Sequence, residues 1–184
     1  MLIPVLGMDP SLRNWGMAEA MLDLNTGILT SPHLSLIQTK DLEGKQVRQN
    51  SSDLHLADQL STGTMPAVHR AKVIFVEVPV GSQSARAMAS YGVCVGILGA
   101  VRSLGIPLIE VTATESKLVF TGNRNATKRD MIDRAVALYP EANFPSSRGR
   151  ITDKAEHVAD AIAAIHAGVK TPTFQNLMRL LKGV

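Results

Sequence analysis

The sequence has little of what disulfide-rich, metal-caged or membrane-spanning proteins need. Its 184 residues include one cysteine, Cys94, and only 4% are aromatic. A single cysteine excludes an intrachain disulfide and any metal cage built from several cysteines, and it fits a reducing compartment. We expect Cys94 to be buried and to act as a small hydrophobic residue. The leading MLIPVL lacks the basic flank and length of a signal sequence, and no apolar run could span a bilayer. We therefore expect a soluble, cytoplasmic protein with no membrane partner.

The size and charge of the chain favour one domain that can accept an anionic partner. With 45% hydrophobic residues, the chain can bury one core but is too short for two comfortable domains. No internal repeat, linker or low-complexity tract divides it. The formal net charge is only +3, and the sequence pI of about 9.2 permits a polyanionic partner without demanding one.

The order of apolar and turn-forming segments predicts an α/β fold. Strands are expected at 2–8, 15–22, 26–40, 72–80 and 106–112, and helices at 50–71, 82–105, 126–140 and 153–169. Gly63 and Pro66 are expected to interrupt the first of these helices. Three antiparallel strands followed by alternating helices and strands predict a mixed central sheet with helices packed against it.

Acidic residues occupy positions in this pattern where an apolar core is expected. Asp9 and Glu77 lie in or at the end of predicted strands, and a carboxylate there is costly unless it is paired or bound to a metal. In the last predicted helix, His157 and Asp160 are three residues apart and share one face. If that face is turned toward the sheet, three carboxylates and an imidazole converge, which suits divalent cations such as Mg²⁺.

Each of these residues also has a purely structural explanation. Asp9 could open a turn, Glu77 could pair with an arginine, and His157 could be a core histidine with a satisfied hydrogen bond. The spacing of Asp153 and Glu156 is typical of a capping box, so we assign this pair a structural role at the start of the last helix.

Four segments carry a resemblance to a known family: GMDPSLRNWGMA, IFVEVPV, ATESKLVFTGNRNATKRDM and HVADAIAAI. In this order the sequence resembles the RuvC-type Holliday junction resolvases, from about Leu2 to Gly168 and most weakly between Gly44 and Ala71. That family belongs to the RNase H-like nucleases, so the resemblance implies an RNase H-like fold. We accordingly assign 1–170 to a nuclease domain and 171–184 to a C-terminal tail that forms a short helix or stays mobile.

The resemblance also implies roles for the acidic set. Asp9, Glu77, His157 and Asp160 match the metal-binding and catalytic positions, the third of which is Asp in some family members and His in others. Asp9 is expected to be the central ligand able to bridge two ions, with Glu77 and Asp160 on either side and His157 as a ligand or a nearby base. Mg²⁺ is the expected cofactor, and the histidine should make the site receptive to Mn²⁺.

Basic side chains accumulate between 117 and 154. By the resemblance, Lys117 and Lys128 match positions near the scissile phosphate, and Arg124 and Arg129 are further candidates for DNA binding through the phosphate backbone. A solvated surface of mixed charge is the alternative, because acidic residues are interspersed in the same stretch.

Residues 84–101 have almost no polar face, which predicts a helix packed on the sheet on one side and on a second copy of the chain on the other. The prediction is a homodimeric, Mg²⁺-dependent endodeoxyribonuclease that resolves four-way DNA junctions by paired phosphodiester hydrolysis. Two alternatives remain: an RNase H-like nuclease for other branched DNA or RNA–DNA hybrids, and a junction-binding protein with a decayed site. Val80 stands where many family members carry an aromatic that stacks on a junction base, so the sequence preference of the cut stays open.

Overall fold

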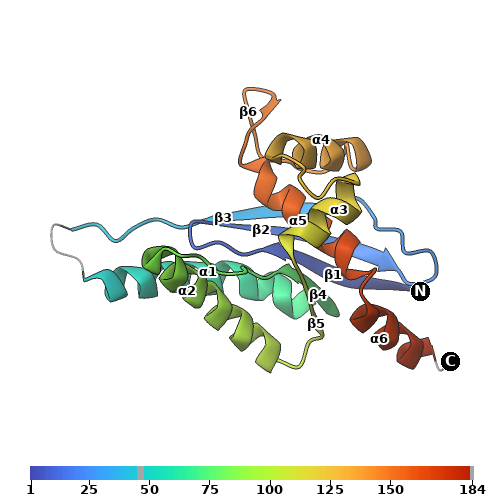
Figure 1. Ribbon diagram of the computed structural model, residues 1–184, viewed down its shortest axis with the longest axis horizontal. Coiled ribbons are helices and arrows are strands. Elements are labelled where there is room, and N and C mark those ends of the chain that lie inside the picture. Colours follow the sequence, from blue (N-terminus) through green and yellow to red (C-terminus); the bar gives the residue numbers. More distant parts are fainter. Residues whose placement is uncertain (45–47, 183–184) are drawn as a thin grey trace.

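A computed structural model describes residues 1–44 and 48–182 and shows one mixed sheet between two layers of helices (Figure 1). The elements are, in chain order, β1 (Leu2–Asp9), β2 (Asn14–Asp23), β3 (His33–Gln38), α1 (Gln49–Arg70), β4 (Val73–Glu77), α2 (Ala85–Ser103), β5 (Leu108–Val111), α3 (Ala113–Thr121), α4 (Lys128–Leu138), β6 (Ser146–Ser147), β7 (Arg150–Ile151), α5 (Ala155–Gly168) and α6 (Pro172–Lys182). Within these ranges, no helix combines the length and apolarity needed to cross a membrane.

The main sheet has five strands in the order β3-β2-β1-β4-β5. β1, β2 and β3 pair antiparallel, whereas β4 lies parallel to both β1 and β5. The mixed sheet predicted from the sequence is therefore confirmed. β1 lies in the middle with a partner on each side, so a residue at its end has strands on both flanks.

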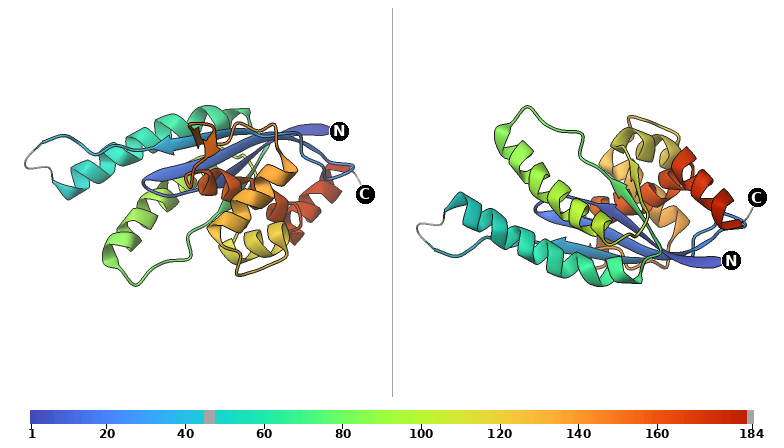
Figure 2. Two further views of the ribbon diagram at one scale, coloured as in Figure 1. Left: turned by 90° about the horizontal axis from the view of Figure 1, so that it is seen from above. Right: turned by 90° about the horizontal axis from the view of Figure 1, so that it is seen from below.

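The side chains of β1 and β4 alternate between two hydrophobic cores, as successive strand residues must. Leu6 and Ile74 belong to the core shared with α1 and α2. Val5 and Phe75 belong to the core shared with α3, α4, α5 and α6. Figure 1 shows α3, α4 and α5 on the opposite side of the sheet from α1 and α2, and both views of Figure 2 place the N-terminus and α6 at one end of the molecule, away from the first turns of α1.

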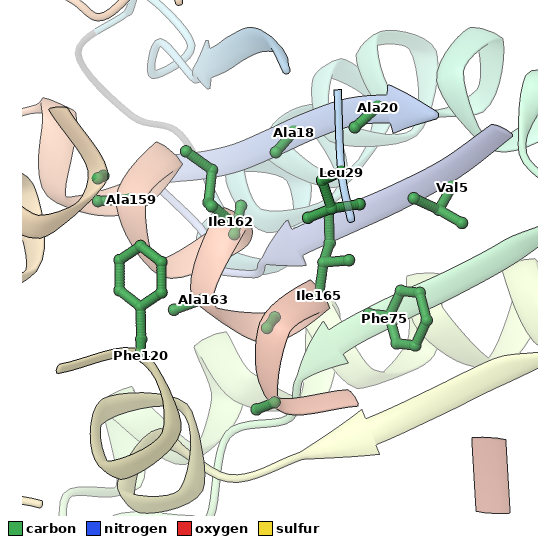
Figure 3. Close-up of a cluster of buried hydrophobic side chains, with 14 of the residues drawn as sticks. Val5, Ala18, Ala20, Leu29, Phe75, Phe120, Ala159, Ile162, Ala163 and Ile165 are labelled. Atoms are coloured by element: carbon green, nitrogen blue, oxygen red, sulfur yellow. The ribbon is translucent and has the colours of Figure 1, made fainter. Parts of the chain in front are cut away.

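α5 is buried along most of its length. Ten of its 14 residues are buried, many of them alanines, and Figure 3 shows its side chains among those of β1, β2 and β4. Two strand glycines allow this close approach. A Cβ added at Gly7 would lie 2.0 Å from the carbonyl oxygen of Ala161, and one at Gly16 would lie 2.1 Å from that of His157. The backbone of α5 thus rests directly on the backbones of β1 and β2.

The predicted interruption of the first helix is wrong. α1 continues from Gln49 through Gly63 and Pro66 to Arg70. Its buried positions, Leu56 and Leu60 before the glycine and Val68 after the proline, keep helical spacing along one face. Packing of that face against the sheet therefore overrides the local cost of the glycine and the proline.

Three other segments differ from the sequence prediction. The stretch 113–121 forms α3, which was not predicted, and residues 146–151 form the short β6–β7 hairpin. The third strand is confined to 33–38, preceded by an isolated bridge between Leu22 and Leu29.

Of the predicted tail, 172–182 forms α6, which buries Phe174 and Met178 against the core, and 183–184 lie outside the described residues.

Candidate active site

Two candidate carboxylates end neighbouring parallel strands. The register of β1 and β4 pairs Met8 with Val76, so that Asp9 and Glu77, the next residues, close the two strands at one edge of the sheet. Alternate residues of a strand share one face of the sheet. Asp9 therefore lies on the same face as Val5 of β1, and Glu77 on the same face as Phe75 of β4, and this face is covered by the core that contains α5. Strand register alone therefore brings these two acids together on the side of the sheet that α5 covers.

The first turns of α5 supply the other two candidates. His157 and Asp160 lie near the start of this helix, where the Gly16 contact presses the His157 backbone onto β2. The His157 Nδ1 atom lies 2.8 Å from Asp9 Oδ2, and the side chains of both residues are less than one fifth exposed. The helix face predicted to turn toward the sheet does so.

All four candidates line one pocket of about 380 Å³. Its walls come from the carboxyl ends of β1 and β4, the loop after β4, and helices α2 to α5. Besides the four candidates, the side chains with polar or aromatic chemistry are Ser11, Tyr91, Lys117, Lys128 and Glu156. The pocket thus combines a cluster of buried acids with two lysines.

The electrostatics of the pocket are those of crowded carboxylates. Burial raises the pKa of Glu77 to about 7, and the charge of Asp9 adds to the rise. Burial likewise raises the pKa of Asp160 to about 8, with contributions from Asp9, Glu77 and Glu156. The positive charge of Lys117 acts in the opposite direction on the pKa of both groups. The pocket therefore favours the protonated, neutral form of both carboxyls near neutral pH, and a positive charge beside them would favour the ionised form.

Two buried polar atoms near this cluster lack a partner. Glu156 Oε2 and Ser116 Oγ form no hydrogen bond within the described part of the chain. Ser116 nevertheless lies close enough to Glu77 to lower its pKa slightly against the larger effect of burial. Buried polar atoms are normally satisfied, so the free oxygen of Glu156, which lines the pocket, indicates a binding partner there.

The predicted capping role of Asp153 and Glu156 is wrong. The residue before α5 is Lys154, in right-handed helical conformation, and no side chain caps the helix. Glu156 instead points into the pocket, where Oε1 accepts a hydrogen bond from Lys128 Nζ at 2.8 Å and lies 3.6 Å from His157 Nε2. Sequence reasoning missed this acid because its spacing from Asp153 also fits a capping box.

The donor set suits a hard divalent cation, although it is not arranged as a complete ligand shell. Carboxylate oxygens are the ligands that Mg²⁺ and Mn²⁺ prefer, and His157 adds a nitrogen. Among the described residues, no three His, Cys, Asp or Glu side chains stand ready to hold one ion together. The raised pKa values and the unpartnered Glu156 oxygen are nevertheless what a missing positive charge would leave behind.

The predicted DNA-binding residues fall in different places. Lys117 and Lys128 line the pocket, and Arg129 lines an adjoining one. Arg129 also pairs with Asp133 one helical turn away. Arg124 lies exposed between α3 and α4 and is not among the lining residues of either pocket.

The remaining predictions near the site concern Val80, the aromatic residues and Cys94. Val80 is 85% exposed in the loop after β4, at the pocket wall. Tyr91 of α2, which no sequence pattern singled out, is the aromatic residue among those that line the pocket. Cys94 is fully buried, and burial raises the pKa of its thiol to about 12, so the expected inert hydrophobe is confirmed.

Comparisons with known proteins rest on structure. No protein-family model matches the sequence, and no curated protein does either. The fold is similar to that of Thermus thermophilus RuvC in complex with Holliday junction substrate, at 15% identity and a TM-score of 0.64 over 90% of this chain and 92% of that one. A second T. thermophilus RuvC structure gives 16% identity and a TM-score of 0.63 over 98% and 97%. The chain therefore has the RuvC-like, RNase H-like fold implied by the resemblance.

Proposed function

We propose that this protein is a metal-dependent endonuclease that resolves four-way DNA junctions. The observation that supports this function best is the convergence of Asp9, Glu77 and Asp160, from three separate elements, in one pocket with Lys117 and Lys128. Such a set holds the cations and the phosphate that phosphodiester hydrolysis requires. One structure of similar fold contains a Holliday junction substrate, which makes junction DNA the first substrate to test.

In this proposal, Asp9, Glu77, His157 and Asp160 hold Mg²⁺ or Mn²⁺. A bound divalent cation activates water at neutral pH and offsets charge on the leaving oxygen. Two lysines of the chain are placed to bind the phosphate. Lys117, on α3, places positive charge beside Glu77 and Asp160, where it can hold the scissile phosphate. Lys128 reaches the pocket from the start of α4 and is held there by Glu156.

The proposed active form is a two-fold homodimer formed through α2. Met88 and Val95 on this helix are each nearly half exposed. A Cβ added at Gly92, Gly96 or Gly99 would meet nothing within 4 Å, so the exposed face of the helix carries apolar side chains with open space beside its glycines. A two-fold dimer would offer one pocket to each of two symmetric strands of a junction. We further propose that 1–170 form the nuclease domain, against whose core α6 of the tail packs.

A cleavage assay tests the proposed function directly. Purified protein should nick a synthetic four-way junction at paired positions with Mg²⁺ or Mn²⁺ and leave it intact in EDTA. Flap, duplex and RNA–DNA hybrid substrates of matched length serve as comparisons. Preferential cutting of the flap or hybrid would assign the same site to another substrate, and tight junction binding without cutting of any substrate would indicate a decayed nuclease.

A further inference from the structure

The β6–β7 hairpin has a basic residue where its backbone disfavours one. Ser147 pairs with Arg150, so Arg148 and Gly149 form a two-residue turn, and their φ angles are 50° and 74°. Positive φ at both positions is the turn geometry for which Asn-Gly or Gly-Gly is preferred. Arg148 is the one non-glycine residue with positive φ among the described residues. The sequence thus carries an arginine at this tip at a conformational cost that glycine would avoid.

The charges of the hairpin are not used within the fold. Arg148 and Arg150 are exposed, and neither forms an ion pair within the described part of the chain. Five other surface arginines pair with carboxylates: Arg13, Arg70, Arg86, Arg102 and Arg129. Exposed Arg124 resembles the hairpin arginines in forming no ion pair among the described residues. The hairpin extends outward beside α4, beyond the rest of the helical layer (Figure 1). It presents two free guanidinium groups at an exposed tip.

A second pocket connects the base of this hairpin to the candidate active site. It has a volume of about 440 Å³, and its lining includes three basic residues, Lys128, Arg129 and Lys154, and two acidic ones, Asp153 and Glu156. It shares Lys128, Glu156 and His157 with the first pocket. Lys154 follows β7 by three residues and donates a hydrogen bond to Gln38 of β3, which fixes it beside the hairpin base. Basic side chains therefore occur from the shared wall of the two pockets to the hairpin tip. Lys128 and Arg129 are ion-paired with Glu156 and Asp133, so the cations without an ion-pair partner among the described residues are Lys154 and the two hairpin arginines.

We infer that the hairpin and this second pocket bind the phosphate backbone of a nucleic-acid arm that leaves the active site. This inference rests on the proposed nuclease function and adds a binding surface to it. Arginine and lysine contacts of this kind neutralise phosphates without reading bases. Arg148 and Arg150 are therefore positioning residues, which hold the arm while the cleavage chemistry takes place in the first pocket.

Arg148→Gly is the decisive variant, because glycine accepts the turn geometry and removes an exposed side chain together with its charge. The thermal midpoint should be unchanged or higher, whereas affinity for a long-armed junction at low salt should fall about tenfold and the log–log salt slope should flatten by about one unit. Arg150→Ala should weaken binding similarly. Lys170→Ala, which removes an exposed charge at the opposite end of α5, should change neither quantity.

Arm length separates this inference from the proposed function. Shortening the junction arms stepwise should abolish the difference between Arg148→Gly and wild type, and at saturating protein both should cut at the same rate. Affinities measured in EDTA test the hairpin even if the wild type cuts no junction, an outcome that would overturn only the proposed function. Affinity of Arg148→Gly equal to wild type at every arm length and salt concentration overturns the inference, as does a loss equal to that of Lys170→Ala.

Discussion

His157 Nδ1 lies 2.8 Å from Asp9 Oδ2, although 148 positions separate the two residues in the chain. The contact joins the end of the central strand to the first turn of the buried helix. It exists because Gly16 lets the His157 backbone rest on β2. The imidazole therefore contacts the same carboxylate whose charge helps to raise the pKa of both Glu77 and Asp160. Any cation held by Asp9 must share that carboxylate with His157.

The first prediction concerns the three carboxylates. Asp9→Asn, Glu77→Gln and Asp160→Asn should each abolish cleavage while leaving junction binding intact, because each removes ligand charge but little volume. Single-turnover cleavage and a binding titration in EDTA measure the two properties. Glu110→Gln removes an exposed acid that pairs with Arg102 and should leave both unchanged. Near wild-type cleavage by any of the three variants would refute its assignment as a metal ligand.

The second prediction concerns His157. His157→Asp should keep measurable activity with Mg²⁺, because a carboxylate can replace the imidazole as a hard ligand. The wild type should be relatively more active with Mn²⁺ than this variant, since imidazole favours the softer ion. The ratio of cleavage rates in the two metals is the measurement. An inactive but folded His157→Asp beside an active His157→Ala would show that the residue is not a ligand.

Much of the fold follows from sequence because its signals are local. The apolar runs at 2–8 and 72–80 fix the strands, and acids at their ends stand out against them. α3 was missed although it carries two recognisable signals, a capping box formed by Thr112 and Glu115 and a left-handed Gly122 at its C-terminus. The helix has only nine residues, and its apolar pattern was too short to be recognised although both caps were present.

Other features of the site depend on tertiary contacts that no local pattern contains. Glu156 has the spacing of a capping residue, and only the approach of Lys128 from α4 makes it a pocket residue. Gly7 and Gly16 look like ordinary strand glycines, yet each is needed where α5 touches the sheet. The sequence predicts the convergence of Asp9, Glu77 and Asp160, but neither the presence of Glu156 beside them nor how closely the helix that carries Asp160 can approach.

The third prediction tests this close approach. Gly16→Ala places a Cβ 2.1 Å from the carbonyl oxygen of His157, so the start of α5 must shift. Overpacking of this kind costs about 1–3 kcal/mol. The free energy of unfolding should fall by that amount, and cleavage should fall at temperatures where the variant stays folded. Chemical denaturation and cleavage on the same samples would decide it, and unchanged values of both would mean that α5 does not rest on β2 as described.

The fourth prediction concerns His166, whose Nε2 lies 2.8 Å from the Tyr139 hydroxyl. Burial lowers its pKa from 6.5 to about 4, and the charges of Arg134 and Lys170 add to the effect. Because the folded state holds the neutral form, this group costs no stability above pH 6.5. As the pH falls from 6.5 to 4, protonation of the unfolded chain removes up to about 3 kcal/mol.

His166→Gln does not titrate and should flatten this acid-induced loss of stability. Urea denaturation of the wild type and the variant at pH 7.5 and pH 4.5 gives the comparison. The difference between the two pH values should be smaller in the variant. His33→Gln, at an exposed histidine, is the control and should follow the wild type. A variant as sensitive to acid as the wild type would place the sensitivity in other groups.

The fifth prediction concerns Lys117 and Lys128. Each should position the scissile phosphate, so Lys117→Ala or Lys128→Ala should slow cleavage substantially and lower junction affinity only modestly, to the same extent for different sequences. The log–log salt slope should flatten by about one unit per phosphate contact removed. Lys128→Ala also removes the ion-pair partner of Glu156, and the Glu156 side chain is only 15% exposed. The double variant Lys128→Ala/Glu156→Gln separates these effects: a slow double variant assigns the loss to the lysine, whereas recovery of the rate assigns it to the unpaired acid. Unchanged rates and salt slopes in both single variants would show that neither lysine touches DNA.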